Sequence, residues 1–146
     1  MKRTTIVIHH TAGKDNKYIK DYNQILNDHL DRGWRDIGYN YVIEYVTGKV
    51  KIHRGRKLDI PGAHCPQHNM NKEGIGIAIV GNFERHAPDI FLIQELACLC
   101  SQLCLDHDIP PGKIRSHKEF KPTLCPGKHM PMDYIRQLVK DNLTTV

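Results

Sequence analysis

The sequence predicts an α/β fold: a single domain over residues 1–146, with a central mixed β-sheet flanked by about three helices. Two apolar, β-branched runs at residues 4–9 and 75–80 are typical of strands buried on both faces. Three longer segments, each of which follows one or more of the predicted strands, carry apolar residues at helical spacing. With 146 residues, 40% hydrophobic and 25% charged, the chain has the composition of one globular domain rather than of a disordered or fibrous protein.

The first half of the chain is expected to supply a strand, a helix and a hairpin. After the strand at 4–9, apolar residues spaced three and four apart predict a helix over residues 16–30, which Gly33 ends. Residues 40–46 and 49–53 read as two strands joined by a Thr47-Gly48 turn. A long loop over residues 54–73 follows, and loops of this length are usually functional.

The second half is expected to complete the sheet and cover it. The strand at 75–80 is followed by Asp89, a plausible N-cap for a long, mostly buried helix that reaches about residue 107. Residues 114–117 form a short strand, residues 118–129 a loop, and residues 132–143 a last helix that begins after Pro131. This order of elements favours a mixed sheet with helices on both faces.

Charge and composition argue against several classes of partner. The net charge is +5 and the pI about 9.0, but no run of five basic residues occurs, so we expect no nucleic-acid binding. No uninterrupted apolar run approaches the ~18–20 residues that span a bilayer, so no membrane partner is expected. The basic N-terminus has no apolar h-region, which predicts cytoplasmic synthesis without a signal peptide. Five cysteines, an odd number, favour free thiols or a metal site over a disulfide framework.

Three residues are candidates for a metal site. His9 and His117 lie at the ends of predicted strands, and Cys125 lies in the loop that follows His117. Two imidazoles and one thiolate suit zinc, and three protein ligands with one open position define a catalytic zinc site. On spacing alone, however, a core histidine or an inert buried thiol remains the more ordinary interpretation of each residue.

Five motifs in order resemble the type-two N-acetylmuramoyl-L-alanine amidases, a family that includes phage lysozyme-type amidases and animal peptidoglycan recognition proteins. They are IVIHHTA at 6–12, DIGYNY at 36–41, GR at 55–56 with GAH at 62–64, GIGIAIVGNF at 74–83, and SHKE at 116–119 with TLCPG at 123–127. The motifs run through most of the chain, and five in order are far more specific than any one alone.

The resemblance assigns metal-binding and catalytic roles to individual residues. It places the zinc ligands on His9, His117 and Cys125, with one Zn²⁺ per chain, and leaves His10 as a non-ligand. It places a catalytic tyrosine on Tyr39, for which a strand-edge tyrosine that packs beside Tyr41 is the alternative. Thr123 stands where phage members carry lysine and many animal members carry threonine. A further branch, the cytosolic recycling amidases, has a glutamate where this chain has Ala78, so the general base stays unassigned.

The resemblance also suggests four substrate-binding residues. His64 matches a position that lines the substrate groove, and Asn69 follows in the same loop, whose register against the family is uncertain. Arg56 would meet a carboxylate of the stem peptide or form a structural salt bridge. Asn82 would cap the groove or only turn the chain.

The activity that the resemblance implies is hydrolysis of the amide between the lactyl group of N-acetylmuramic acid and L-alanine in peptidoglycan. We expect a monomeric phage or prophage endolysin that acts on the cell wall after release. Two alternatives stay open: a non-catalytic peptidoglycan-binding module, and a cysteine hydrolase that uses Cys125 and His117. Some phage members also bind a polymerase, a second role that the sequence neither supports nor argues against.

Overall fold

The protein is built around a five-stranded sheet with strand order β3-β2-β4-β1-β5. The computed structural model describes residues 1–12 and 21–145. The strands are β1 (Thr5–His10), β2 (Tyr41–Val46), β3 (Lys49–Arg54), β4 (Gly74–Ile79) and β5 (Ile114–Ser116). Strands β2, β4, β1 and β5 run parallel to one another, and β3 pairs antiparallel with β2, so the sheet is mixed as predicted.

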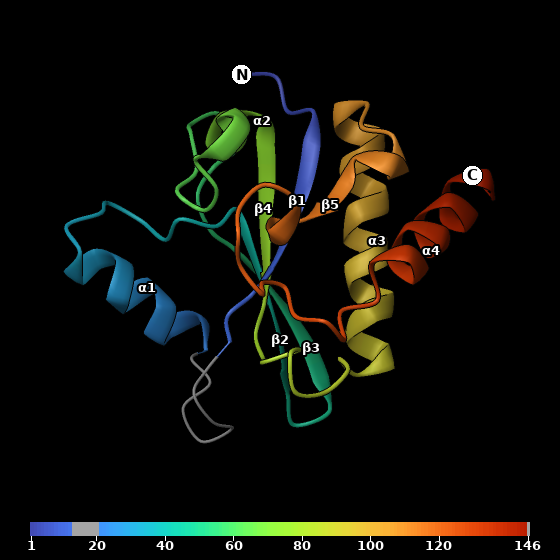
Figure 1. The fold of residues 1–146 in the computed structure, drawn as a ribbon, viewed down its shortest axis with the longest axis horizontal. Coiled ribbons are helices and arrows are strands. Elements are labelled where there is room, and N and C mark those ends of the chain that lie inside the picture. Colours follow the sequence, from blue (N-terminus) through green and yellow to red (C-terminus); the bar gives the residue numbers. More distant parts are fainter. Residues whose placement is uncertain (13–20, 146) are drawn as a thin grey trace.

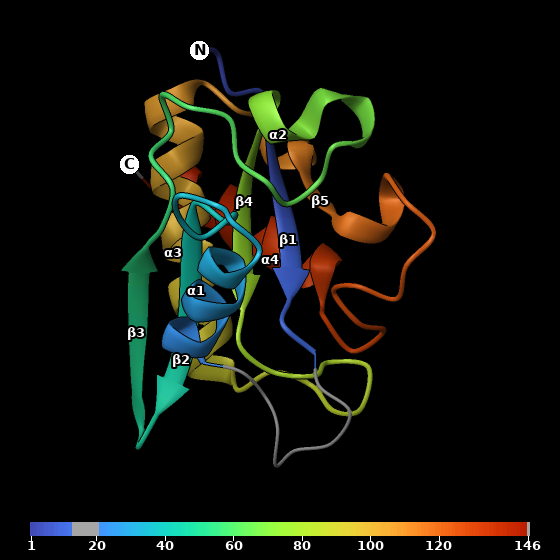
Figure 2. The ribbon, with the colours of Figure 1, turned by 90° about the vertical axis from the view of Figure 1, so that its left-hand side faces the viewer.

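Helices cover both faces of this sheet, which confirms the predicted fold class (Figure 1). Helix α1 (Tyr22–Asp31) lies on one face, and α3 (Ile90–His107) and α4 (Met132–Thr144) pack together on the other. The view in Figure 2 shows α1 in front of the sheet and α3 behind it. The fourth helix, α2 (Met70–Glu73), is a single turn that leads into β4.

Alternation along β1 and β4 sorts their side chains between the two faces. Ile6 and Ile8 join the isoleucines of β4 in the large core cluster under α3 and α4. Val7 faces the opposite side, where it packs with Cys65 and Met70. His9 lies two residues after Val7, so its side chain points to the same face of the sheet, away from α3. All six residues of β1 are buried, as its apolar sequence predicts.

Helix α3 is, by length and composition alone, apolar enough to cross a bilayer, although its sequence is interrupted by polar residues. Eight of its residues are buried inside the protein, and all of these but Ser101 pack in the core cluster that the sheet and α4 complete. That packing is what the central helix of a folded domain shows.

The structure differs from the predicted elements mainly at their ends. The expected start of the first helix at residue 16 lies outside the described residues, and α1 itself begins at Tyr22 behind the N-cap Asp21. The loop at 54–73 is not continuous loop, because a 3-10 turn (Gln67–Asn69) and α2 occupy its end. The last short strand ends at Ser116, and His117 opens a 3-10 turn.

Candidate metal centre

The ends of two neighbouring parallel strands bring the three candidate ligands together. Because β1 and β5 pair in parallel, with Ile8 opposite Ser116, His9 and His117 leave the sheet at the same edge. The loop after His117 returns Cys125 to this point, and the ligand atoms of the three residues all lie within 4.8 Å of one another. The Sγ of Cys125 is 3.8 Å from Nδ1 of His9. Residues far apart in the sequence thus form one compact donor group.

His9 is held as a neutral imidazole. Its side chain is only 1% exposed, and burial, followed by the nearby His64, His117 and His10, holds its pKa well below the usual range. A neutral imidazole keeps one nitrogen lone pair, which is the form that binds a metal. The adjacent His10 points to the other face, where its Nδ1 accepts a hydrogen bond from the backbone N–H of Phe83 at 3.1 Å.

The ring of His117 lacks hydrogen-bond partners within the described part of the chain. Both of its nitrogens are buried and neither meets a donor or acceptor there. Buried polar atoms without partners are rare and costly, so they call for an explanation. A cation between His117, His9 and Cys125 would give one of these nitrogens a partner.

Cys125 has an environment that suits a thiolate only if a cation is present. Its Sγ accepts a hydrogen bond from the backbone N–H of His10 at 3.3 Å, but burial is the larger effect and raises the pKa of the thiol to about 12. A divalent cation would compensate the thiolate charge. Two neutral imidazoles and a thiolate are a zinc donor set, and the residues present fit that ion.

Two hydroxyl groups lie next to this centre. The ring of Tyr39 is 5.1 Å from that of His9, centroid to centroid, and burial, reinforced by Cys125, raises the pKa of Tyr39 to about 12. The phenol therefore stays protonated near neutral pH and is a hydrogen-bond donor. Thr123 Oγ1 accepts from the backbone N–H of Cys125 at 3.3 Å, so its hydroxyl hydrogen is free to point elsewhere.

A cavity of 370 Å³ opens beside Cys125, and we call it the Thr123 cavity. Asn82 and Glu84 line it together with Thr123 and Cys125. Asn82 follows β4 and accepts a hydrogen bond from the backbone N–H of Glu84 at 3.2 Å, a local turn at the cavity wall. The structure therefore places Asn82 and Thr123 at one opening next to the donor group.

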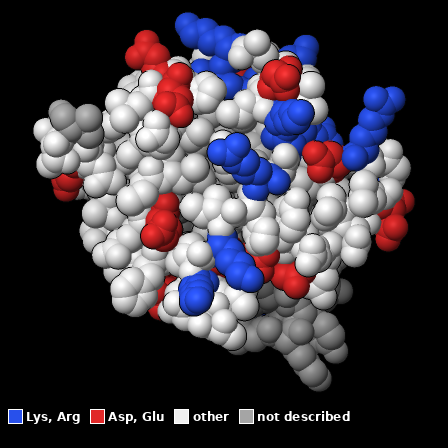
Figure 3. Space-filling model, turned by 180° about the vertical axis from the view of Figure 1, so that it is seen from behind, with Lys and Arg blue, Asp and Glu red and all other residues white. Residues whose placement is uncertain are grey.

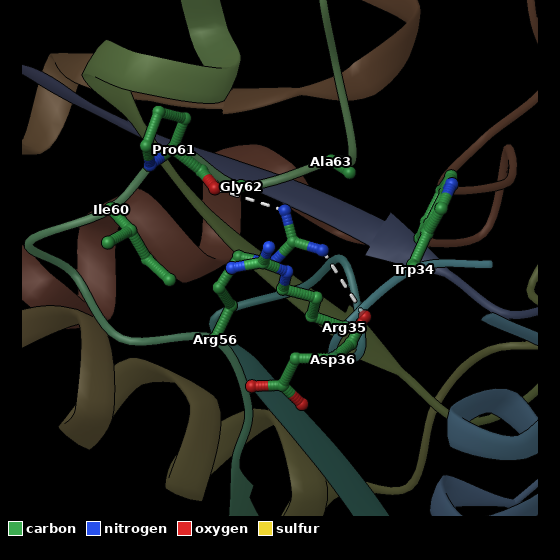
Figure 4. Close-up of a pocket in the computed structure, with 8 residues that line it drawn as sticks. All are labelled: Trp34, Arg35, Asp36, Arg56, Ile60, Pro61, Gly62 and Ala63. Carbon is green, nitrogen blue, oxygen red and sulfur yellow. Dashed lines mark hydrogen bonds between the residues drawn. The ribbon is translucent and has the colours of Figure 1, made fainter. Parts of the chain in front are cut away.

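Arg56 lies in a second cavity of 460 Å³, which Trp34, Arg35 and Ala63 also line (Figure 4). Its guanidinium donates to the backbone carbonyls of Ile37, Asp36 and Pro61 at 3.1–3.2 Å. These bonds tie the chain before β2 to the loop after β3. The contacts shown are to carbonyl oxygens rather than to a carboxylate, and a substrate role for Arg56 stays a prediction.

The remaining two predicted substrate residues lie in different surroundings. His64 is 9% exposed, and its ring nitrogens contact Nε2 of His9 at 3.0 Å and the carbonyl oxygen of Gly74 at 3.2 Å. Asn69 is exposed, and its amide donates to Glu73 at 3.3 Å. The contact between His64 and His9 was missed from sequence, where 55 positions separate the two residues.

Comparison with known proteins decides the family. The family model for N-acetylmuramoyl-L-alanine amidase matches residues 1–128. The chain belongs to the N-acetylmuramoyl-L-alanine amidase family. This confirms the resemblance that the sequence motifs predict.

Relatives in this amidase family include both enzymes and recognition proteins. A peptidoglycan-recognition protein of Drosophila simulans is 33% identical over 130 residues, which cover 86% of this chain and 69% of that protein. Among solved structures, N-acetylmuramoyl-L-alanine amidase LysC from Clostridium intestinale URNW has a TM-score of 0.82 at 28% identity and covers 96% of this chain and 87% of its own. Drosophila PGRP-LB has a TM-score of 0.69 at 26% identity, covering 88% of this chain and 76% of its own.

Membership of the amidase family supports a function on peptidoglycan. The family model and the LysC fold favour an amidase, while the recognition relatives leave a binding function as the alternative within the same fold. The choice between them therefore depends on the chemistry of the donor group.

Proposed function

We propose that the chain is a zinc-dependent N-acetylmuramoyl-L-alanine amidase. Its substrate would be the amide between the lactyl group of N-acetylmuramic acid and L-alanine of the stem peptide. The observation that carries this proposal is the group formed by His9, His117 and Cys125, whose ligand atoms all lie within 4.8 Å of one another. The unpartnered nitrogens of His117 support a metal at this place.

The chemistry requires help because an amide is a poor electrophile and water a poor nucleophile at neutral pH. When bound, zinc lowers the pKa of a water at its open position to about 7 and polarises the substrate carbonyl. His9 Nδ1 and Cys125 Sγ would hold the ion together with one ring nitrogen of His117.

Tyr39 and Thr123 would act on the substrate carbonyl. The phenol of Tyr39 is protonated, since burial raises its pKa to about 12, so it donates a hydrogen bond to the carbonyl oxygen as negative charge develops there. The Thr123 hydroxyl lines the Thr123 cavity and donates in the same way. Water adds its oxygen to the lactyl carbonyl carbon, and cleavage of the C–N bond then leaves a lactyl carboxylate and releases the alanine as an amine, which takes up a proton from that water.

Two solved neighbours support a place for the enzyme on the cell wall. The endolysin N-acetylmuramoyl-L-alanine amidase LysCS of Clostridium intestinale URNW is 29% identical with a TM-score of 0.82. A PGRP-LB variant, 25% identical with a TM-score of 0.68, is seen in complex with tracheal cytotoxin. We infer that this chain acts as a monomeric phage or prophage endolysin, made in the cytoplasm and released to bind muropeptide units of the wall.

The surface charge is compatible with loose contact to an anionic wall. On the face seen in Figure 3, Lys and Arg lie among Asp and Glu rather than forming one basic patch. The net charge of +5 would therefore aid association weakly, and nucleic acid is not a proposed partner.

A cysteine hydrolase is the weaker alternative. A nucleophilic cysteine needs a lowered pKa, whereas burial raises that of Cys125 to about 12. A peptidoglycan-binding module is the stronger one, because the relatives at 33% identity are named recognition proteins. The presence of the thiol of Cys125 in the donor group favours the enzyme over the peptidoglycan-binding module.

The deciding experiment follows release of new amino groups from purified peptidoglycan. We expect amine release that stops on chelation and returns with added zinc, and about one zinc per chain by elemental analysis. His117→Ala should lose most of the zinc and the activity, whereas His129→Ala, at an exposed histidine, should retain both.

Each other outcome points to a different function. Zinc binding without amine release would support the recognition module. Amine release that survives chelation but is lost on thiol alkylation would support the cysteine hydrolase.

A further inference from the structure

We propose that His64 is a positioning residue that fixes the ring and the tautomer of the zinc ligand His9. Its Nδ1 lies 3.0 Å from Nε2 of His9, on the far side of the ring from the Cys125 thiol. The inference rests on the proposed zinc function and adds a residue that the donor group itself does not contain. The buried His64 would then act on the ligand His9 rather than on substrate in the substrate groove.

The two edges of the His9 ring have separate tasks. Nδ1 faces Cys125 Sγ at 3.8 Å, within the donor group, and Nε2 faces His64. A neutral imidazole carries a hydrogen on one nitrogen and a lone pair on the other. A metal ligand needs the lone pair at Nδ1, so the hydrogen must sit on Nε2 and needs an acceptor.

A backbone carbonyl settles which nitrogen of His64 is that acceptor. The oxygen of Gly74 lies 3.2 Å from Nε2 of His64, and a carbonyl oxygen can only accept. His64 Nε2 is therefore the donor, and its Nδ1 carries the lone pair. That lone pair accepts from His9 Nε2–H, which leaves His9 Nδ1 free for the metal. The tautomers of both rings thus follow from one carbonyl.

The ring of His64 has little room to move. A Cβ added at Gly76 would lie 2.6 Å from the ring, and one at Gly62 would lie 2.8 Å from it, so the two glycines make its slot. Asn71 Oδ1 accepts from the backbone N–H of His64 at 2.8 Å and holds the loop that carries it. The rings of His9 and His64 meet edge to face at 89°.

The carbonyl that fixes the chain of hydrogen bonds is itself held in place. Arg3, 2% exposed, donates from Nη1 to the same Gly74 oxygen at 2.8 Å. Its other donors bind the carbonyls of Leu58 and Ile60 in the long loop. The support for His9 therefore runs from a buried guanidinium through Gly74 and His64 to the ligand nitrogen.

The test compares zinc affinity in two variants at position 64, measured by competition with a chromogenic chelator. His64→Leu removes the acceptor and keeps an apolar filling, and we expect zinc to bind about 10–100-fold more weakly. His64→Asn returns an acceptor oxygen near the place of Nδ1 and should recover most of the loss. The control His129→Leu, at an exposed histidine, should bind zinc as the unchanged chain does.

Two further readouts separate positioning from folding. The visible spectrum of the cobalt-substituted protein should change in His64→Leu and return toward the original in His64→Asn. Nitrogen NMR of the zinc-loaded, unchanged chain should show His9 protonated on Nε2 and bound to metal through Nδ1, and this test needs no variant to fold. Equal zinc affinity in His64→Leu would overturn the positioning role alone. A proton on Nδ1 of His9 in the zinc-loaded chain would overturn both the positioning role and the choice of Nδ1 as the ligand atom of His9. An unchanged chain that binds no zinc would overturn the proposed function as well.

Discussion

The hydroxyl of Tyr39 can be removed by a substitution that leaves the aromatic ring in place. The Tyr39→Phe change keeps the ring that packs beside His9 and removes only the donor. We expect the turnover number to fall about 10²–10³-fold, as for loss of one donor to a developing oxyanion. Zinc affinity should stay unchanged, because the proposed metal donors are His9, His117 and Cys125. Amine release from peptidoglycan and chelator competition measure the two quantities.

Tyr41 provides a matched control for this prediction. It lies two residues further on but packs against the core cluster on the α3 side, whereas Tyr39 packs on the α1 side. Tyr41→Phe should therefore leave turnover within about twofold of the unchanged chain, as surface-like changes away from a site do. Equal turnover in Tyr39→Phe and the unchanged chain would remove Tyr39 from the mechanism.

At this scale, residue types and order in the sequence predict which side chains meet but not how they are held. His9 and His117 meet because neighbouring parallel strands end at a common edge, which the strand pattern implies, whereas the place of Cys125 beside them is implied only by the family resemblance. The partners of Arg56 are backbone carbonyls of a folded loop, and no local pattern encodes them. The contact of His64 with His9 also depends on loop geometry, for which the sequence offers only flanking glycines.

Strand β4 combines buried isoleucines with glycines, and a substitution at Gly76 tests whether a glycine is needed there. A Cβ at this position would lie 2.6 Å from the His64 ring, which packs in a closed slot. We expect Gly76→Ala to destabilise the protein by about 1–3 kcal/mol, the usual cost of overpacking. It should also weaken zinc binding, because the displaced His64 ring no longer meets His9. Chemical denaturation and chelator competition measure the two effects.

Gly112 is the control for that substitution within the same chain. A Cβ there would meet no atom within 4 Å, so Gly112→Ala should change neither stability beyond about 0.5 kcal/mol nor zinc affinity. If Gly76→Ala proved as harmless as Gly112→Ala, the slot around His64 would be looser than its distances indicate.

Elements with a β-branched run, a clear turn, strong periodicity or a clear cap were predictable from the sequence, whereas the start of α1 and the single turn α2 were not. Asp89 caps α3 by accepting from the backbone N–H of Phe91 at 2.8 Å, as the sequence predicts. The start of α1 depends instead on a capping box between Asp21 and Gln24. The apolar helical spacing begins earlier in the sequence, so this spacing does not reveal where the helix starts. Helix α2 is a single turn, too short for a periodic signal.

At the scale of the whole molecule, strand order decides where the chemistry lies. Strand β1 sits between β4 and β5, so the candidate ligand His9 has loops from both sides within reach. The loop after β5 brings His117 and Cys125 next to His9, and the loop before β4 brings His64 to the other edge of the His9 ring. The candidate metal centre therefore lies where the end of β1 meets the loop that precedes β4 and the loop that follows β5.

The same burial predicts how the metal-free protein responds to acid. In the folded chain burial holds the pKa of His9 well below its usual 6.5 and lowers that of His64 to about 4, while an unfolded chain would bind protons near 6.5. Because the unfolded state then binds more protons, stability is complete above about pH 6.5 and falls as the pH drops toward 4. As the pH falls from 6.5 to 5, the loss of stability for each buried histidine approaches about 1.4 kcal/mol per pH unit.

Chemical denaturation in the presence of a chelator, at steps between pH 7.5 and 5, measures this loss. The window stays above the range in which ordinary carboxyl groups titrate. In His64→Leu the slope should shrink by about one proton per molecule, because one buried imidazole is gone, whereas the exposed His129→Leu control should keep the full slope. A flat profile in the unchanged chain would mean that water reaches the rings of His9 and His64, which would contradict their burial beside the candidate metal ligands.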